Sequence, residues 1–194
     1  MHWIDPDFLT PHTSTVTRYL FNPKGDADGM LLADGTEAHF PPHLSQEVLR
    51  HIRPGEAVTL YGVKPRSADM IACVALQSAG GKRISDTGPP PKKKKSHADK
   101  RVEDDRESIE LEGIVERTLH GPKGEVRGVL LTAGTLVRFP PHVVEGSLKA
   151  LLTPGKPLAV RGEARSVSGT QVIEAKALGK SKAHLKAFDR KPHD

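Results

Sequence analysis

The amino-acid sequence predicts an all-β fold in which one small module occurs twice, with a linker between the two copies. Three observations lead to this prediction. Segments of the first half recur in the second half at a constant offset, short apolar runs alternate with Pro and Gly, and only 36% of the residues are apolar. A composition this poor in apolar side chains favours small modules with long solvated segments over one large core.

The repeat is clearest at residues 35–43, Gly-Thr-Glu-Ala-His-Phe-Pro-Pro-His, which recur 99 positions later as Gly-Thr-Leu-Val-Arg-Phe-Pro-Pro-His. The same offset aligns the Pro-Lys-Gly segments that contain Lys24 and Lys123, and it aligns Arg18 with Arg117. So many matches in one register indicate a duplication within the chain.

Each copy is expected to hold five strands. Ile109 and Leu111 alternate with glutamates, which is the period of a strand. Pro-Lys-Gly predicts a turn after the first strand, and Asp34-Gly35 predicts a tight type I′ hairpin after the second. The expected strands of the first copy are 15–21, 30–33, a third ending at Phe40, 57–63 and 70–76; those of the second are 109–119, 129–132, a third ending at Phe139, 158–164 and 171–178.

A short helix is expected between the third and fourth strands of each copy. The double prolines end the third strand, because proline cannot donate to the ladder. In the first copy Ser45 is expected to cap the helix, with Val48, Leu49 and Ile52 on its apolar face. The corresponding apolar residues of the second copy are Leu148, Leu151 and Leu152.

Three strands, a helix and two further strands in about 70 residues resemble the OB-fold, a five-stranded Greek-key barrel. The pattern Gly-x-Leu-Leu-x-x-Gly-Thr-x-x-x-Phe-Pro-Pro-His also resembles a motif in bacterial OB-fold proteins of uncharacterised role. An SH3-like small barrel is the structural alternative, and the helix before the fourth strand favours the OB-fold. The resemblance implies a face that binds oligonucleotides or oligosaccharides.

The predicted organisation has five parts. They are an N-terminal extension (1–12), a first OB-like repeat (13–79), a disordered linker rich in Lys and Pro (80–108), a second repeat (109–179) and a basic tail (180–194), which is either disordered or a short helix around 183–188. The absence of a basic segment followed by an apolar one at the N-terminus argues against a signal peptide, and no apolar run spans a membrane. We therefore expect a cytoplasmic protein without membrane contact.

Charge separates the two halves of the chain. Residues 1–80 carry six basic and nine acidic side chains, whereas residues 109–180 carry ten and seven. An anionic partner is therefore expected mainly at the second half. Aromatic side chains, on which bases stack, fall mostly in the first copy, so contacts to phosphate should dominate and sequence preference should be weak.

We predict a nucleic-acid-associated binding protein with single-stranded DNA or RNA as partner. A protein-interaction or assembly module is the alternative, with a protein as partner. The candidate phosphate contacts are Arg18, Lys24, Arg117, Lys123, Arg127, Arg138, Lys92, Lys93, Lys94 and Lys95. The opposing interpretation is that these are solvated strand, turn and linker residues.

Catalysis, metals and cofactors are not expected. The sequence holds no phosphate-binding loop, no nucleophile elbow and no zinc-binding helix motif. Cys73 lies in an apolar run and is expected to be a buried, inert thiol. His43 and His142 follow the double prolines, and we expect them to hydrogen-bond at the helix start rather than to bind metal.

Overall fold

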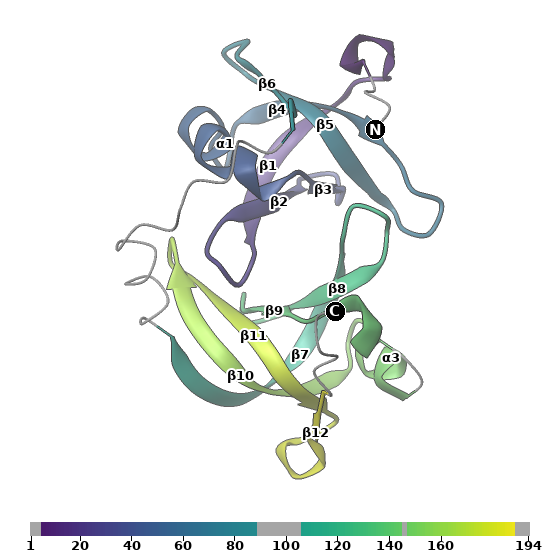
Figure 1. Cartoon of the computed structure of the whole chain (residues 1–194), viewed down its shortest axis with the longest axis vertical. Coiled ribbons are helices and arrows are strands. Elements are labelled where there is room, and N and C mark those ends of the chain that lie inside the picture. The colour runs from purple at the N-terminus through teal and green to yellow at the C-terminus, as the bar shows by residue number, and fades with distance from the viewer. Residues whose placement is uncertain (1–4, 89–105, 145–146, 189–194) are drawn as a thin grey trace. The chain divides into compact units, whose positions relative to one another are not determined.

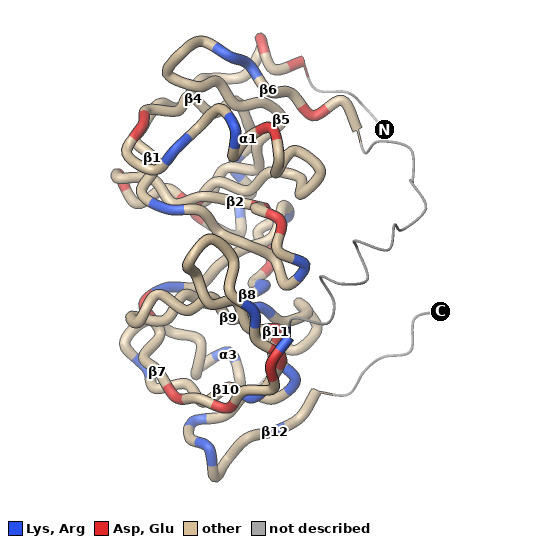
Figure 2. The backbone as a smooth tube through the Cα atoms, turned by 90° about the vertical axis from the view of Figure 1, so that its left-hand side faces the viewer, with Lys and Arg blue, Asp and Glu red and all other residues tan. Residues whose placement is uncertain are grey.

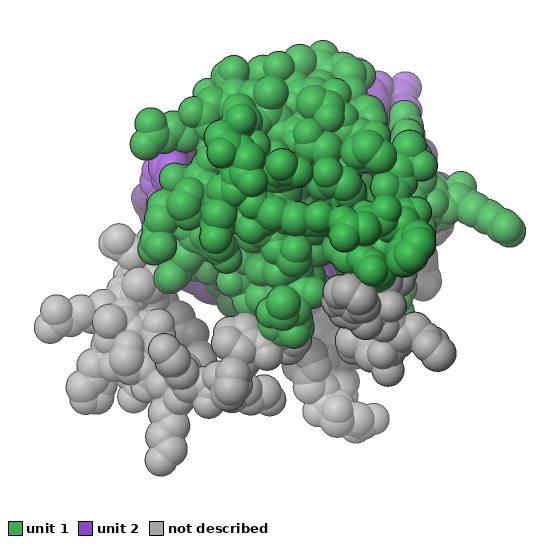
Figure 3. Space-filling view, turned by 90° about the horizontal axis from the view of Figure 1, so that it is seen from above, with its two compact units in different colours: residues 1–94, 120–125 green, residues 95–119, 126–194 purple. Residues whose placement is uncertain are grey.

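The computed structural model describes residues 5–88, 106–144 and 147–188. The chain divides into two compact units, residues 1–94 with 120–125 and residues 95–119 with 126–194, which Figure 3 distinguishes by colour. Each unit is built around one barrel of strands, and Figure 1 traces the strands of both.

The first barrel closes on itself. Its strands lie in the order β3-β2-β1-β4-β5, and β5 also pairs with β3 in parallel, Glu37 opposite Met70. This is the strand order of an OB-fold. The strands are β1 (His12–Phe21), β2 (Ala27–Leu32), β3 (Glu37–His39), β4 (Ala57–Val63) and β5 (Met70–Ser78), and the helix α1 (Ser45–His51) lies between β3 and β4.

The second barrel repeats this arrangement. Its order is β10-β7-β8-β9-β11, closed by the pairing of β10 with β11. The strands are β7 (Glu107–His120), β8 (Val126–Leu131), β9 (Leu136–Arg138), β10 (Pro157–Val167) and β11 (Thr170–Gly179), with α3 (Ser147–Leu151) between β9 and β10. The prediction of two small five-stranded barrels, each with one short helix, is confirmed.

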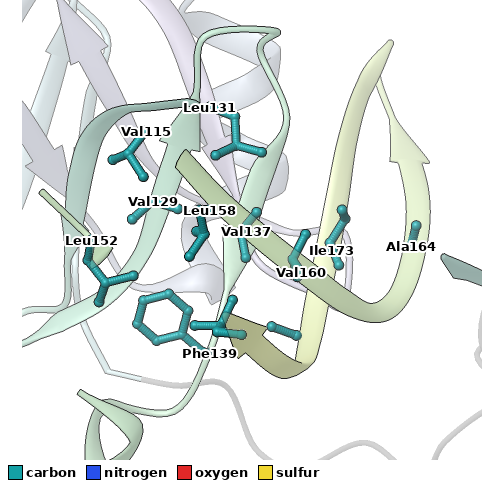
Figure 4. Packing of buried hydrophobic residues seen from close by; sticks show 12 residues of the cluster. Val115, Val129, Leu131, Val137, Phe139, Leu152, Leu158, Val160, Ala164 and Ile173 are labelled. Atoms are coloured by element: carbon teal, nitrogen blue, oxygen red, sulfur yellow. The ribbon is translucent and has the colours of Figure 1, made fainter. Parts of the chain in front are cut away.

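The core of the second barrel comes from alternate residues of its strands. Val115, Val129, Val137 and Ile173 are at most 1% exposed and point into one cluster, which Figure 4 shows from close by. Phe139 closes one end of the cluster, as expected for the residue that ends the third strand. Residues that alternate along a strand point to the same face, so the members of this cluster recur with a period of two.

The hairpin after the second strand differs from the prediction. Leu32 accepts a hydrogen bond from the amide of Gly35 (2.9 Å) and donates its own amide to Thr36 (3.0 Å), and φ is positive at Gly35 (86°) but not at Asp34. This is a three-residue loop with a type I turn and a glycine bulge, not a type I′ turn. Because the position before Gly35 keeps a negative φ, Ala133 serves equally well in the second repeat.

The prediction for α1 was partly wrong. Ser45 does not cap the helix, because its hydroxyl accepts a hydrogen bond from the amide of Ala27 at the start of β2 (2.8 Å). Val48 and Ile52 are buried as expected, but Leu49 is 37% exposed. Val48 and Leu49 are neighbours in sequence and therefore point in directions about 100° apart around the helix, and only the direction of Val48 and Ile52 faces the core.

Each barrel carries a sixth short strand that the sequence did not predict. β6 (Arg83–Ser85) pairs with β5, and β12 (Lys186–Ala187) pairs with β11. The helix expected near 183–188 is instead a 3₁₀ turn, Lys182–His184, followed by β12. Two or three residues are too few to show an alternating pattern.

In the first repeat, Tyr19 ties the end of the helix to the barrel. Its ring is buried, and its hydroxyl donates a 2.5 Å hydrogen bond to the carbonyl of Ile52, directly after α1. Burial, together with the charge of Glu56, raises the pKa of the Tyr19 hydroxyl above its usual value. The second repeat has Thr118 at the corresponding position, so only the first repeat has this contact.

We expect Tyr19→Phe to lower the free energy of unfolding by about 1–2 kcal/mol, because the buried carbonyl of Ile52 loses its donor. Urea denaturation followed by circular dichroism measures this loss. Tyr61→Phe is the matched control, since the Tyr61 hydroxyl bonds Gln77 at a partly exposed site (3.2 Å). Equal losses for the two variants would contradict the assigned role of Tyr19.

The hairpin between β10 and β11 contains the one non-glycine residue with positive φ in the described part of the chain, Ser168 (49°). With Gly169 (78°) it forms a two-residue turn between paired Val167 and Thr170. We expect Ser168→Asn to raise the free energy of unfolding by about 0.5–1 kcal/mol, because Asn tolerates this conformation better than Ser. Ser166→Asn, on the adjoining strand, should give no such gain in the same denaturation assay.

Candidate nucleic-acid interface

Basic side chains gather on the C-terminal part of the second repeat. Residues 147–188 contain eight Lys or Arg and only two acidic residues, Glu163 and Glu174. Figure 2 shows basic positions along the chain from the end of β11 into β12. These cations come from α3, from β10 and β11, and from the segment that follows β11: Lys149, Lys156, Arg161, Arg165, Lys176, Lys180, Lys182 and Lys186.

The two glutamates are held by a cation from outside this stretch. Glu163 of β10 and Glu174 of β11 lie directly opposite each other, an arrangement in which like charges repel. Arg106 bridges both carboxylates, at 3.1 Å from Glu163 and 2.9 Å from Glu174. Within the stretch, Lys176 also lies 3.3 Å from Glu174, and Arg161 lies 3.9 Å from Glu110 outside it. The positive charge that remains for other partners is therefore carried mainly by the lysines outside these pairs.

Three lysines lie at one end of this repeat beside a groove of about 290 Å³. The groove is lined by Leu148, Leu151, Leu178, Gly179, Lys180, His184 and Lys186. Lys180, Lys182 and Lys186 are exposed, and none of them forms an ion pair with another described residue. Ser181 and His184 are hydrogen-bonded to each other (2.7 Å), and the amide of Lys182 donates to Glu112 (2.6 Å), which fixes the path of this segment.

The phosphate contacts predicted from sequence differ in exposure. Lys24 and Lys123 lie in corresponding turns and are exposed, as is Arg127 on β8. Arg18 on β1 and Arg117 on β7 are partly buried, and Arg138 on β9 is only 7% exposed. Lys92, Lys93, Lys94 and Lys95 lie outside the described residues.

The aromatic side chains offer few stacking surfaces. Phe21 and Phe40 are buried in the first barrel, and Phe139 is buried in the second. Tyr61 is partly exposed, but the Arg83 guanidinium lies over its ring, 4.7 Å from the centroid. The described part of the basic repeat therefore has no fully exposed aromatic ring on which a base could stack.

His43 has a structural partner in the first repeat. Its Nε2 lies 3.0 Å from the Asp86 carboxylate, which also accepts the amide of Gly88 (2.9 Å). Asp86 follows β6, so this contact joins the start of the helical segment to the sixth strand. We expected a backbone partner for His43, and the structure shows a carboxylate instead. His142, at the corresponding position, is exposed.

Neither a reactive thiol nor a metal-binding cluster is found in the described residues. Burial raises the pKa of the Cys73 thiol to about 12, so the thiolate needed for nucleophilic attack is scarce at neutral pH. No cluster of three or more His, Cys, Asp or Glu side chains is placed to hold a metal ion in those residues. No helix among them is long and apolar enough to cross a membrane.

Comparison with known proteins found no matching family model and no matching curated protein. Among solved structures, the chain is similar to two forms of the single-stranded DNA binding protein from Thermus aquaticus. The deletion mutant is 14% identical with a TM-score of 0.27 over 94% of this chain and 95% of that one, and the wild-type protein is 14% identical with a TM-score of 0.26 over 94% and 93%. TM-scores of this size do not establish a shared fold, so the fold assignment rests on the strand order of each barrel.

The bridge made by Arg106 can be tested by a double-mutant cycle. We expect Arg106→Gln to lower the free energy of unfolding by about 1 kcal/mol, because Glu163 and Glu174 then repel each other across the strands. The loss should nearly vanish in the Glu163→Gln, Glu174→Gln background, in which both carboxylates that Arg106 bridges are neutral, measured by urea denaturation. An undiminished loss in that background would show that Arg106 stabilises the barrel by other contacts.

Proposed function

We propose that this protein binds nucleic acid without catalysing a reaction, through phosphate contacts that carry little sequence preference. The observation that carries the proposal is the excess of cations on residues 147–188, where the only two acidic side chains are engaged by Arg106. Lysines that contact phosphates release counterions on binding, which makes affinity depend strongly on salt.

The second repeat is the proposed principal contact surface. Lys180, Lys182 and Lys186 project from the end of the barrel, and Lys149 on α3 and Lys156 before β10 add to the same charge excess. The exposed Lys24, Lys123 and Arg127, together with the linker lysines 92–95, extend the proposed contact set. Arg18, Arg117 and Arg138 offer less surface to a phosphate.

Phosphate contacts without base stacking should give binding with little preference for nucleotide sequence. A base stacked on an aromatic ring contributes about 1–3 kcal/mol, and it favours single strands because duplex bases are already stacked. The one aromatic ring of the described second repeat that is not buried is Phe188, which packs partly against the core. Modest sequence preferences arise from the strength of stacking, so a surface that contacts mainly phosphates has little basis for them. We therefore propose that single strands of different sequence bind with similar affinity.

Fluorescence anisotropy of a labelled single-stranded oligonucleotide of mixed sequence, titrated with the full chain at several salt concentrations, tests this function. With about four phosphates contacted, the log–log salt slope should be about −3. The triple variant Lys180→Gln, Lys182→Gln, Lys186→Gln should bind more weakly, and its slope should be shallower by about 2.

A variant with the same loss of charge on the first repeat provides the control. Arg50→Gln, Arg53→Gln, Arg66→Gln replaces three exposed cations there and should change affinity far less. Equal losses of affinity in the two triple variants would show that binding follows the net charge of the protein and not a localised surface. A salt-independent affinity would contradict the phosphate-dominated mechanism.

A further inference from the structure

The first barrel has an open strand edge that the second barrel lacks. β1 pairs with β4 from Thr15 opposite Ala57 as far as His12 opposite Leu60. Pro11 precedes β1 and has no amide to donate, so the ladder stops there. The next residues of β4, 61–63, are paired with β5 on their other side only, in the part of the chain that the structure describes.

In the second barrel the same edge is filled by the chain itself. The pairing of β7 with β10 continues past the corresponding point, through Ile109 opposite Gly162, to Glu107 opposite Ala164. Ile109 packs against the barrel core from this added stretch. Residues 107–110 therefore pair with the edge of β10 in the second barrel. Residues 8–11, which occupy the same positions in the first repeat, do not pair with the edge of β4.

A groove lies where the missing stretch would run. It measures about 420 Å³ and is lined by Phe8, Leu9, Thr10, Pro11, His12, Leu60, Gly62, Val63, Lys64 and Ile71. Gly62 corresponds to Gly162, which faces Ile109 in the second barrel. Phe8 is 89% exposed and Val63 is 44% exposed, so apolar surface borders the groove on both sides.

The N-terminal wall of the groove lies beside β4 and is anchored by contacts of its own. Pro6 is buried, and the Asp5 carboxylate accepts a hydrogen bond from the amide of Asp7 (3.0 Å). Asp7 in turn binds Arg83 of β6 at 2.7 Å, and the Arg83 guanidinium lies over the ring of Tyr61. These contacts hold residues 5–8 in a 3₁₀ turn and keep the groove open.

The charge around the edge favours an acidic occupant. Lys64 and Arg66 follow directly after this edge and are exposed, and the one acidic residue of the loop between β4 and β5 is Asp69. Near the N-terminal side, the Asp5 carboxylate accepts the amide of Asp7, Asp7 is bound to Arg83, and Asp34 is bound to His12. In the second barrel, the strand that fills this position alternates glutamates with Ile109 and Leu111.

We propose that residues 61–63 of β4 accept an extended peptide of a partner protein, which adds to the barrel as an antiparallel strand. The peptide alternates apolar with acidic residues. Its apolar side chain opposite Gly62 enters the groove over Leu60 and Ile71, and its acidic residues meet Lys64 and Arg66. Strand addition of this kind takes affinity from main-chain hydrogen bonds and specificity from alternate side chains. This proposal does not depend on nucleic-acid binding.

The test uses the full chain labelled with ¹⁵N and a synthetic peptide, Asp-Arg-Glu-Ser-Ile-Glu, which is the sequence of residues 105–110 and ends before the position that β1 already occupies. Titration to about 1 mM should shift the amide resonances of residues 61–64 and 8–12. A peptide with Ser in place of Ile, which keeps the charge, should cause no shift there. A shift by both peptides, or by neither, would overturn the proposal.

Charge variants test the predicted chemistry of the partner. The double variant Lys64→Glu, Arg66→Glu should weaken peptide binding about tenfold, because two attractions become repulsions. The matched variant Lys180→Glu, Lys182→Glu changes the same charge on the second repeat and should leave peptide affinity unchanged. If oligothymidylate shifts the same amides and displaces the peptide, the groove is a nucleic-acid site and the proposal is wrong.

Discussion

Closure of each barrel by its last long strand is the constraint on which the rest of this structure depends. β5 must pair antiparallel with β4 along one edge and parallel with β3 along the other, and β11 does the same with β10 and β9. The strand that precedes the last long strand, β4 or β10, therefore has to bend. The bend lies at a register shift at Gly62 and at Gly162, where a side-chain carbon would collide with the backbone of the neighbouring strand. Glycine at both positions is thus a condition of closure.

This constraint explains why so much of the fold was predictable from sequence. The geometry of a closed barrel restricts residue type most strongly at turns, bends and strand ends. The two copies share their residues at these positions. Pro-Lys-Gly, Gly35 with Gly134, and the double prolines mark the same points in both barrels. Five strands and one helix per copy follow from their spacing together with the period-2 alternation.

The features that escaped prediction depend on contacts between distant residues. Ser45 has a side chain suited to a helix cap, but its hydroxyl instead satisfies the amide of Ala27, 18 residues away. β6 and β12 form because the edges of β5 and β11 offer hydrogen-bond partners. The loops that lead to them differ in length, so the two strands do not align at the offset that relates the repeats. The type of the Asp34-Gly35 turn was misjudged because a dipeptide does not reveal whether two or three residues connect the strands.

The candidate interface was predicted in outline only. Composition showed that the second half is basic, yet it could not show that Glu163 and Glu174 are held by Arg106, which is 57 and 68 residues away in sequence. Nor could it show that Phe21, Phe40 and Phe139 are buried while Phe8, in the N-terminal extension, is exposed. Electrostatic sites depend on which charges remain after local pairing, and stacking sites depend on which rings remain after packing.

Duplication has left the two barrels with the same scaffold but different edges. Exposed strand edges invite unwanted pairing, and proteins restrain them with short length, proline and lysine. The edge of β4 has all three restraints: only residues 61–63 extend past the end of β1, Pro11 ends the neighbouring strand, and Lys64 follows directly. An edge this short cannot hold a partner by backbone hydrogen bonds alone, because few are formed. Recognition must then come from side chains, and the groove beside Gly62 and the two cations beyond Val63 are the features that can distinguish one strand from another.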